Sequence, residues 1–339
     1  MSDSFNASPV RILAFGELLW DMLPTGKKLG GAPVNFLYHA KTLGADVRAL
    51  TRIGDDELGR EILARLQTLG VPNEALQISK TAPTGTVDVS VDCNGSPSYK
   101  IVENVAWDEI QVDRQVLESA IEFLTKPNVA SAFYFGSLAL RSENNKEAVG
   151  RLLEAIPQNV MRICDLNLRA PFYDRETVEF TLEHADVFKL NDLEAVELDQ
   201  LFSDRIQKRL ANFSDARRSL SESLRAGIQN DSNELAQWAA SWLDEFNLKT
   251  IILTCGADGA FLFTQTGYAF APSEKVVVKD AVGAGDSFAA VCAVGLLRGY
   301  SKRVIIEAAA KRAAYVCTQE GGTPELPKEF ADPFGASEI

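Results

Sequence analysis

The sequence predicts an α/β protein, a three-layer α/β/α sandwich with a mainly parallel central sheet and a small β-sheet lid. Two patterns in the 339 residues predict it. Strand-like runs alternate with helix-like runs along most of the chain, and one segment breaks this alternation with a hairpin pattern. Strands that alternate with helices form mainly parallel sheets whose two faces are both covered by helices.

The first strand–helix pairs lie in the N-terminal part of the chain. VRILAF (10–15) is a buried-strand run, and the helical pattern APVNFLYHAKTLG (32–44) follows it. VRALTRIG (47–54) predicts the next strand, and DELGREILARLQTLG (56–70) predicts an amphipathic helix that ends on Gly70. Four later β-rich runs extend the sheet: 130–138, 162–168, 186–191 and 250–256. Ligands bind beyond the C-terminal ends of parallel strands, so the residues that end these runs are candidates for the site.

Two regions depart from the alternation. TGTVDVSVDCNGSPSYKIVEN (84–104) alternates apolar and polar residues around Asn94-Gly95, which is typical of a hairpin with a primed turn. We interpret it as part of a lid. The charge-rich stretch at about 199–245 predicts a helical excursion, in which Trp238 and Trp242 are expected to pack rather than to bind a ligand.

Composition excludes several classes of function. The formal net charge of −13 disfavours a nucleic-acid or anionic-membrane partner. The five cysteines include no C-x-x-C pair and only two histidines are present, so a His/Cys metal site is not expected. Neither a signal-peptide pattern nor an apolar run of about 18 residues occurs, which predicts a reduced cytoplasmic protein.

Two common nucleotide motifs fail. Residues 26–28 read GKK, without the Ser or Thr of a Walker A loop, and Asp21 stands where its first glycine belongs. The glycines at 283 and 285 would need a third glycine where Phe288 stands, so a nicotinamide-dependent oxidoreductase has little support.

DAVGAGDSF (280–288) is the most informative stretch. It places a glycine turn before an apolar helical run, and the free N–H groups and dipole of a helix N-terminus favour an anion. Asp286 lies in this turn. From the residues alone, it is equally well an ordinary N-cap or a functional carboxylate.

LGGAPVN (29–35) is compatible with a sugar-binding turn. Gly30 and Gly31 let the backbone approach a ligand, and the amide of Asn35 offers the donor and acceptor that a vicinal diol needs. The alternative is a tight loop with a helix-capping Asn. Asp21 adds a carboxylate acceptor at the expected ligand edge, unless it is an ordinary loop residue.

Three strand ends carry weaker signals. In DLNLRAPFY, period-two spacing puts Asp165, Asn167 and Arg169 on one side of a strand, with Arg169 as a cation for a phosphate or a hydroxyl-rich ligand. The alternative is a buried Asp165–Arg169 salt bridge. In KLNDLEAVEL, Asn191 and Glu194 fit a hydrated magnesium beside a phosphate or a capping box, which are compatible.

The third strand end is LTCGADGAFLF. It holds Thr254, Gly256 and Gly259 in what is predicted to be a hairpin turn. Its glycines would let the backbone approach a nucleotide, or they serve only the turn.

In this order, GGAPVN, N-x-x-E and D-x-V-G-A-G-D-S-F resemble the ribokinase-type (PfkB) carbohydrate kinases, from about Val10 to Pro327. GELLWD, GGAPVN, DLNLR and VAWD are most similar to bacterial fructokinases. The resemblance implies one discontinuous α/β core and a β lid. The core segments are 10–23, 34–82 and 108–330, and the lid segments are 24–33 and 84–107.

The resemblance also implies roles for individual residues. Asp286 matches the catalytic base, and Gly283, Ala284 and Gly285 match the anion hole for the transferring phosphoryl group. The sugar-binding positions are matched by Asp21, Gly30, Gly31, Asn35 and, from the lid, Glu103. The nucleotide side is matched by Asn191 and Glu194, the phosphate and magnesium motif, and by Thr254, Gly256 and Gly259.

A monovalent-cation site is implied as well. Asp280, with backbone carbonyls near Gly321, resembles a site for potassium. Two positions depart from the family pattern: Val102 or Glu103 stands where many fructokinases carry an arginine, and Glu325 stands where a small polar residue usually assists the cation.

The activity implied is ATP- and Mg²⁺-dependent phosphorylation of the 6-hydroxyl of fructose. The alternatives are another acceptor (2-keto-3-deoxygluconate, ribose or a nucleoside) and a non-catalytic sugar or nucleotide sensor of the same fold. The implied partners are ATP, a small sugar and a second copy of the chain that pairs through the lid edge.

Overall fold

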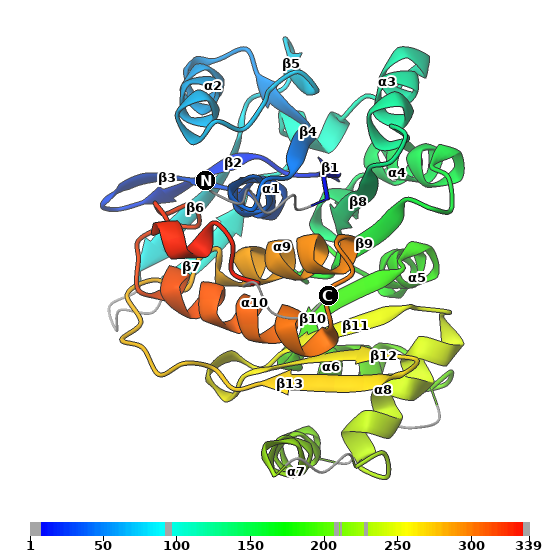
Figure 1. The fold of residues 1–339 in the computed structure, drawn as a ribbon. Helices are drawn as coiled ribbons and strands as arrows, with labels where there is room; N and C mark the ends of the chain where they lie inside the picture. The colour runs from blue at the N-terminus through cyan, green and yellow to red at the C-terminus, as the bar shows by residue number, and fades with distance from the viewer. Residues whose placement is uncertain (1–7, 92–96, 207–209, 211, 227–229, 335–339) are drawn as a thin grey trace, which may run out of the picture.

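The computed structural model describes residues 8–91, 97–206, 210, 212–226 and 230–334. Within them the chain forms a large sheet of nine strands and a small sheet of four. Helices lie on both faces of the large sheet, and the small sheet lies at one side of it (Figure 1). The three-layer sandwich with a small additional sheet is therefore confirmed.

The large sheet is parallel except at one edge. Its strand order is β13-β12-β11-β10-β9-β8-β1-β4-β5, and the antiparallel pairs are β11–β12 and β12–β13. The strands are β1 (Val10–Phe15), β4 (Asp46–Gly54), β5 (Leu76–Ser79), β8 (Ala130–Gly136), β9 (Met161–Asp165), β10 (Val187–Asn191), β11 (Thr250–Thr254), β12 (Ala260–Thr264) and β13 (Gly267–Ala271). The predicted strands are all present, and the hairpin expected around Gly256 is the β11–β12 connection.

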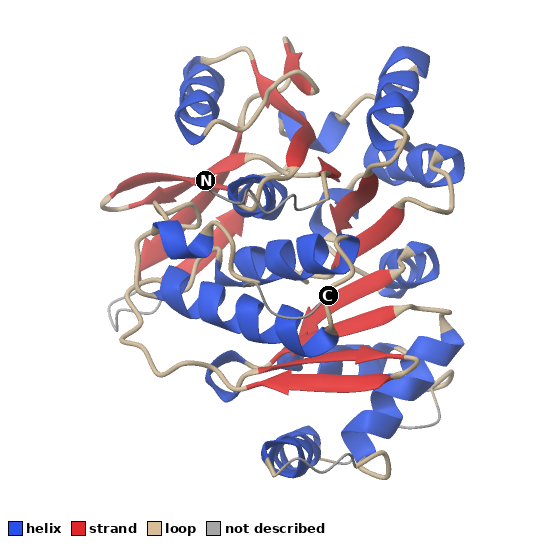
Figure 2. Cartoon of the chain, viewed as in Figure 1, coloured by secondary structure: helices blue, strands red, loops and turns tan. Residues whose placement is uncertain are grey.

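The helices form two layers (Figure 2). One face carries α1 (Ala32–Thr42), α2 (Glu57–Leu69), α9 (Ala284–Leu297) and α10 (Lys302–Cys317). The other carries α3 (Arg114–Leu124), α4 (Glu143–Ala155), α5 (Arg175–His184), α6 (Asp192–Leu201) and α8 (Glu234–Glu245), with α7 (Phe213–Arg225) packed on α8. Side chains alternate along a strand, so each strand feeds both layers. In β1, Leu13 and Phe15 join one hydrophobic core while Ile12 and Ala14 join the other.

The small sheet has the order β3-β2-β6-β7. Its strands are β2 (Leu19–Leu23), β3 (Gly26–Gly30), β6 (Gly85–Val91) and β7 (Pro97–Ile101). The predicted core segment 10–23 contains β2, but β2 pairs with β3 and β6 rather than with the large sheet. Gly16, which has φ 147°, follows β1 directly, three residues before β2 begins. The turn expected at Asn94-Gly95 lies outside the described residues.

The segment around 199–245 is helical where the structure describes it. Trp238 and Trp242 are each 1% exposed and their rings lie 6.0 Å apart, so the packing role predicted for them is confirmed. Among the described helices, none has the length and apolarity of a membrane span.

Candidate active site

The candidate site lies where the strand order reverses. Strand β1 has β4 on one side and β8 on the other, and ligands bind beyond the carboxyl ends of strands at such a switch point. A small cavity opens there, lined by Glu17 after β1, Ser137 after β8 and Asp165 at the end of β9. Helices α1 and α9 both begin nearby, and they pack against each other.

The first turn of α9 is open to a ligand. Gly283 is the N-cap residue, in the left-handed region with φ 76°, and no side chain caps the helix. The interpretation of Asp286 as an N-cap is therefore wrong, because Asp286 is the third residue of the helix. Among the described residues, none accepts a hydrogen bond from the N–H of Gly283, Gly285 or Asp286. A helix N-terminus with unused N–H groups is an anion-binding site.

Asp286 is held by a side chain from α1. Asn35 Nδ2 donates to Asp286 Oδ2 at 2.9 Å. Asn35 is only 3% exposed, and its Oδ1 is buried without a hydrogen-bond partner among the described residues. The alternative of a helix-capping Asn is wrong, since the N-cap of α1 is Gly31 and Asn35 is the fourth helical residue. A buried unpaired acceptor beside a carboxylate is suited to receive a hydroxyl group.

The electrostatics of Asp286 suit a general base. Burial, followed by the negative charge of Asp165, raises the pKa of Asp286 to about 6, against the hydrogen bond from Asn35 and the positive charges of Lys189 and Arg169. The residue keeps partial exposure. It is therefore ionised at neutral pH and close to the pKa that is optimal for proton transfer.

Lys189 is a site residue that the sequence analysis missed. Its Nζ donates to both carboxylate oxygens of Asp165, at 2.8 and 2.9 Å, and both side chains are buried. A Cβ placed on Gly285 would lie 3.5 Å from this Nζ, so the ammonium lies next to the α9 turn. The available signal was a lysine between Phe188 and Leu190, inside the β-rich run DVFKLN.

This pair corrects the prediction for DLNLR. Asp165 is paired with Lys189 and not with Arg169, whose Nη1 donates to the carbonyl of Leu168. Strand β9 ends at Asp165 and Asn167 has φ 46°, so period-two spacing no longer applies beyond Asp165. Arg169 is exposed, yet its charge still lowers the pKa values of Asp21 and Asp286.

Glu17 is the second site residue that was missed. It is 4% exposed, and its Oε1 accepts from the N–H of Ala32 at the start of α1, at 3.1 Å. Burial raises the pKa of Glu17 to about 7. A carboxylate directly after the first strand, in GELLWD, was the signal for it.

The predicted sugar-binding residues line the junction with the small sheet. Asp21 lies in β2, and burial, together with the charge of Asp280, raises its pKa to about 6. A Cβ on Gly30 would lie 2.5 Å from Asp21 Oδ2, and one on Gly31 would lie 2.4 Å from the carbonyl of Glu17. These glycines are thus required by the close packing of the chain itself. Glu103 is exposed, beyond the end of β7.

The first turn of α6 is closed by its own side chains. Asn191 Oδ1 accepts from the N–H of Glu194 at 2.9 Å, and Glu194 Oε2 accepts from the N–H of Asn191 at 2.8 Å. The capping box is confirmed. Glu194 Oε1 accepts from the N–H of Leu168 at 2.9 Å, so each oxygen is already engaged once. Burial raises the pKa of Glu194.

Thr254, Gly256 and Gly259 lie one strand further along the sheet. Thr254 ends β11 opposite Asn191 in the parallel register. Gly256 has φ 52° and open space around it, whereas a Cβ on Gly259 would lie 2.2 Å from the carbonyl of Ala271. The structure therefore brings Thr254 beside the α6 turn, and it leaves the two glycines outside the contacts of Asp286.

Asp280 lies just before the α9 turn and has three donors. Its Oδ2 accepts from the N–H of Gly321 at 2.9 Å and from Lys28 Nζ at 3.1 Å, and its Oδ1 accepts from the N–H of Val282 at 3.0 Å. Burial opposes its ionisation, but these bonds hold the pKa of Asp280 below its usual value. A lysine of the small sheet thus stands at the carboxylate expected to bind potassium.

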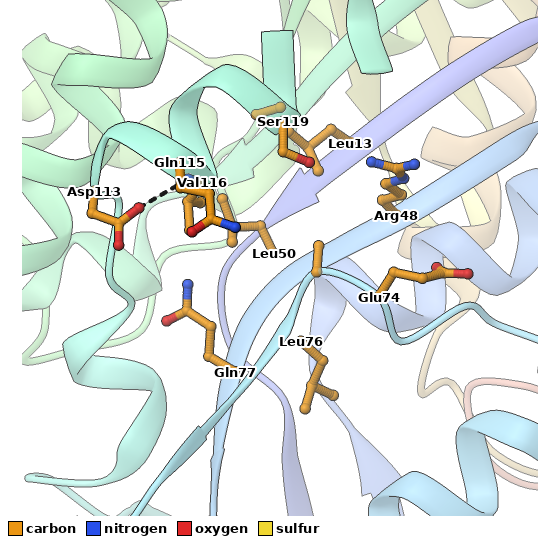
Figure 3. A pocket seen from close by; sticks show the side chains of 12 residues that line it. Leu13, Arg48, Leu50, Glu74, Leu76, Gln77, Asp113, Gln115, Val116 and Ser119 are labelled. Carbon is orange, nitrogen blue, oxygen red and sulfur yellow. Dashed lines mark hydrogen bonds between the residues drawn. The ribbon is translucent and has the colours of Figure 1, made fainter. Parts of the chain in front are cut away.

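A larger cavity lies elsewhere. It has a volume of about 300 Å³ and lies between β5 and α3, with Leu50, Arg48, Gln77 and Asp113 among its lining residues (Figure 3). The polar side chains that could contact a ligand there are mostly exposed. The lining includes no residue that the sequence predicted for the site. The geometry around Asp286 is therefore the stronger candidate.

Comparison with known proteins identifies the family of this chain. The family model for pfkB family carbohydrate kinases matches residues 8–329. The chain belongs to this family. Among the curated relatives of this pfkB family member, fructokinase-2 of Solanum lycopersicum is 25% identical over 344 residues, which is 93% of each chain.

Solved structures share the fold of this pfkB family member. A fructokinase with bound ATP from Xylella fastidiosa has a TM-score of 0.70 at 20% identity, covering 92% of this chain and 94% of that one. A fructokinase double mutant from Vibrio cholerae O395, in fructose, ADP and potassium ion bound form, has a TM-score of 0.69 at 20% identity, covering 94% and 95%. At these identities the likeness establishes the fold and not the acceptor.

Proposed function

We propose that this pfkB family member is an ATP-dependent sugar kinase that phosphorylates the 6-hydroxyl of D-fructose, with Asp286 as general base. The observation that carries the proposal is the hydrogen bond from Asn35 to Asp286 at the open first turn of α9. One site then offers a carboxylate that can take a proton and free N–H groups that can stabilise an anion. Phosphoryl transfer to a hydroxyl group needs both.

Proton removal depends on how Asp286 is oriented. The Asn35 amide binds one carboxylate oxygen, and its own unpaired Oδ1 can accept a hydrogen bond from a sugar hydroxyl. That hydroxyl would be a neighbour of the acceptor hydroxyl, whose own proton would be directed at Asp286. Deprotonation by a carboxylate whose pKa is about 6 leaves the oxygen free to attack the γ-phosphate of ATP.

The transferring phosphoryl group would face residues 283–285. The N–H groups of Gly283 and Gly285 are unused by the described residues, and the N–H of Ala284 makes only a long bond of 3.3 Å to the carbonyl of Ala281. Preorganised amides of this kind stabilise charge that develops in the transition state. Lys189, next to Gly285, adds positive charge without leaving its partner Asp165.

The small sheet would bind the sugar from the other side. Asp21 lies in β2, the exposed Glu103 follows β7, Gly30 and Gly31 form the junction with α1, and Arg169 lies in the loop after β9. Closure over the sugar would exclude water and so prevent idle hydrolysis of ATP. The exposed edge of the same sheet is our proposed contact for a homodimer, which a molar-mass measurement in solution would test.

Magnesium would neutralise phosphate charge on the nucleotide side. Each oxygen of Glu194 accepts one backbone N–H and keeps another lone pair, which fits a water-mediated contact to the ion. Among the described residues, no cluster of three or more His, Cys, Asp or Glu side chains could hold a metal. We therefore assign Asn191, Glu194, Thr254, Gly256 and Gly259 to the nucleotide and its bound ion.

The test is ADP release from MgATP over a panel of acceptors: fructose, ribose, 2-keto-3-deoxygluconate and a nucleoside. Fructose should give the highest kcat/KM, and ³¹P and ¹³C NMR should place the phosphate on carbon 6. The fructokinase relatives support this choice of acceptor. Preference for another acceptor would reject fructose while keeping the kinase, and no ADP with any of them would favour a sensor.

A further inference from the structure

Lys28 links the small sheet to the loop that leads into α9. It lies in β3, and its Nζ is 3.1 Å from Asp280 Oδ2, a residue 252 positions later in the chain. The two side chains are 36% and 19% exposed, so the pair is partly shielded from water. An isolated pair of this exposure contributes little to folding stability. Its position gives it another role.

Asp280 holds two backbone segments that flank the α9 turn (residues 283–286). One oxygen binds the N–H of Val282, directly before Gly283, and the other binds the N–H of Gly321. Next to Gly321, Gly322 packs so closely that a Cβ on Gly283 would lie 2.3 Å from its Cα. Asp280 therefore connects both chain segments that form the wall of the anion site.

The negative charge of Asp280 lies beside the anion site, and Lys28 places a positive charge next to it. A carboxylate beside an anion site repels a phosphate unless a positive charge neutralises it. The ammonium of Lys28 carries that charge and three donors. It also lies opposite Asp21 in the β2–β3 register and lowers the pKa of that carboxylate. Lys28 thus stands between the sugar-binding side of the site and the α9 turn.

We propose that Lys28 is a positioning residue that supplies a positive charge at Asp280, in place of a bound potassium ion, and thereby couples the small sheet to the α9 turn. The inference rests on the proposed kinase function. Asp280 has Lys28 as its cation and two backbone N–H donors, so its described contacts do not fit the potassium site that the family resemblance implies. Phosphoryl transfer in the wild-type protein then needs no monovalent ion, and it depends on β3 being in place.

Lys27 provides a matched control. It is the neighbouring lysine of β3, but it points the other way, toward Glu61 and the ring of Trp20, with its Nζ 5.4 Å from the ring centroid. Lys27→Met and Lys28→Met therefore remove the same charge from the same strand on opposite faces. Lys28→Arg keeps the charge. Circular dichroism and melting curves would verify that all three variants fold.

The first measurement is kcat with MgATP and sugar in potassium, ammonium or tetramethylammonium chloride at constant ionic strength. Wild type and Lys27→Met should change less than about twofold among these salts, since their charge at Asp280 is built in. Lys28→Met should lose about tenfold or more in kcat in tetramethylammonium, the scale of losing one interaction with the developing charge. Potassium or ammonium should raise the kcat of Lys28→Met several-fold above its value in tetramethylammonium. The kcat of Lys28→Arg should stay near that of wild type. Strong activation of wild type by potassium, or equal behaviour of the two Met variants, would overturn the proposal.

The second measurement does not need turnover. Thallium(I), a spectroscopic substitute for potassium, should bind Lys28→Met but not wild type or Lys27→Met in ²⁰⁵Tl NMR. Hydrogen exchange of residues 19–30 should accelerate in Lys28→Met and slow again with potassium. If no acceptor is phosphorylated, the kinase function fails while these two readouts still decide the role of Lys28. Thallium binding to wild type, or unchanged exchange in Lys28→Met, would contradict it.

Discussion

The first turns of helices α9 and α6 use their backbone N–H groups in opposite ways. The α9 turn (residues 283–286) begins at a left-handed glycine with no side-chain cap, and three of its N–H groups have no acceptor among the described residues. The α6 turn (residues 191–194) is closed by the reciprocal bonds of Asn191 and Glu194, and the N–H of Leu193 binds Asp192. The two turns are formed by four-residue stretches of the sequence, GAGD (283–286) and NDLE (191–194).

The difference separates two kinds of ligand contact. An uncapped helix start leaves donors that only a ligand or water can satisfy, so it can bind an anion directly. A capped start contributes to stability, and its remaining capacity lies in the second lone pairs of the capping oxygens. Under the proposed kinase function, the transferring phosphoryl group would therefore bind at the α9 turn and a hydrated ion at the α6 turn.

The largest effect should follow from removing the base in the α9 turn. Asp286→Asn should lower kcat by at least about a hundredfold, a typical contribution of a general base, while sugar binding measured by calorimetry stays within a few-fold. Ser287→Ala is the matched control, because it removes only a hydroxyl that binds the carbonyl of Ala284. Wild-type turnover in Asp286→Asn would show that Asp286 is not the base.

A methyl group at Gly283 tests whether the geometry of the α9 turn matters. Gly283→Ala meets Gly322 Cα at 2.3 Å at a residue with φ 76°, whereas Gly299→Ala has φ 75° and no atom within 4 Å. Both should lose about 1 kcal/mol of unfolding free energy for the left-handed conformation. Only Gly283→Ala should lose more stability and also about tenfold or more in kcat. Equal activity in the two variants would place the phosphoryl group elsewhere.

The pH profile tests the electrostatics of the same turn. Burial raises the pKa of Asp286 to about 6, so kcat should fall as pH drops below that value, by about tenfold at one unit below. The raised pKa stabilises the folded state fully below about pH 4, and this stabilisation is lost as pH rises through about 6. Asp286→Asn should therefore gain in melting temperature relative to wild type between pH 4 and 7. If the melting-temperature difference between Asp286→Asn and wild type shrinks from pH 4 to pH 7, the raised pKa of Asp286 is contradicted.

How far the sequence could predict this site depended on how local each feature is. The capping box of Asn191 and Glu194 and the strand at VRILAF are local patterns, and the structure has both. The contact between Asn35 and Asp286 joins residues 251 apart, so residue spacing could not reveal it. The family resemblance identified both residues, but it did not predict the hydrogen bond between them.

Local rules also failed where long-range contacts determine the conformation. Asp165 was expected to align with Arg169, but the chain turns at Asn167 and the carboxylate pairs with Lys189 of the neighbouring strand. Because Asp favours the N-cap position, an N-cap was one of the two interpretations that the sequence allows for Asp286. In the structure the N-cap is residue 283, where the close approach of Gly322 requires a glycine. The small sheet takes in β2 because β6, more than 60 residues later, pairs with it.

The smallest effect should come from opening the α6 turn. Asn191→Ala removes an N-cap, as does Asn212→Ala, whose side chain accepts from the N–H of Asp215 at the start of α7. Each should cost about 1 kcal/mol of unfolding free energy in urea titrations. Asn191→Ala should also raise the KM for MgATP about three- to tenfold, the size of one water-mediated contact, and Asn212→Ala should not. An identical KM in the two variants would make the α6 turn purely structural, and the nucleotide-bound ion would then have to be held from another strand end.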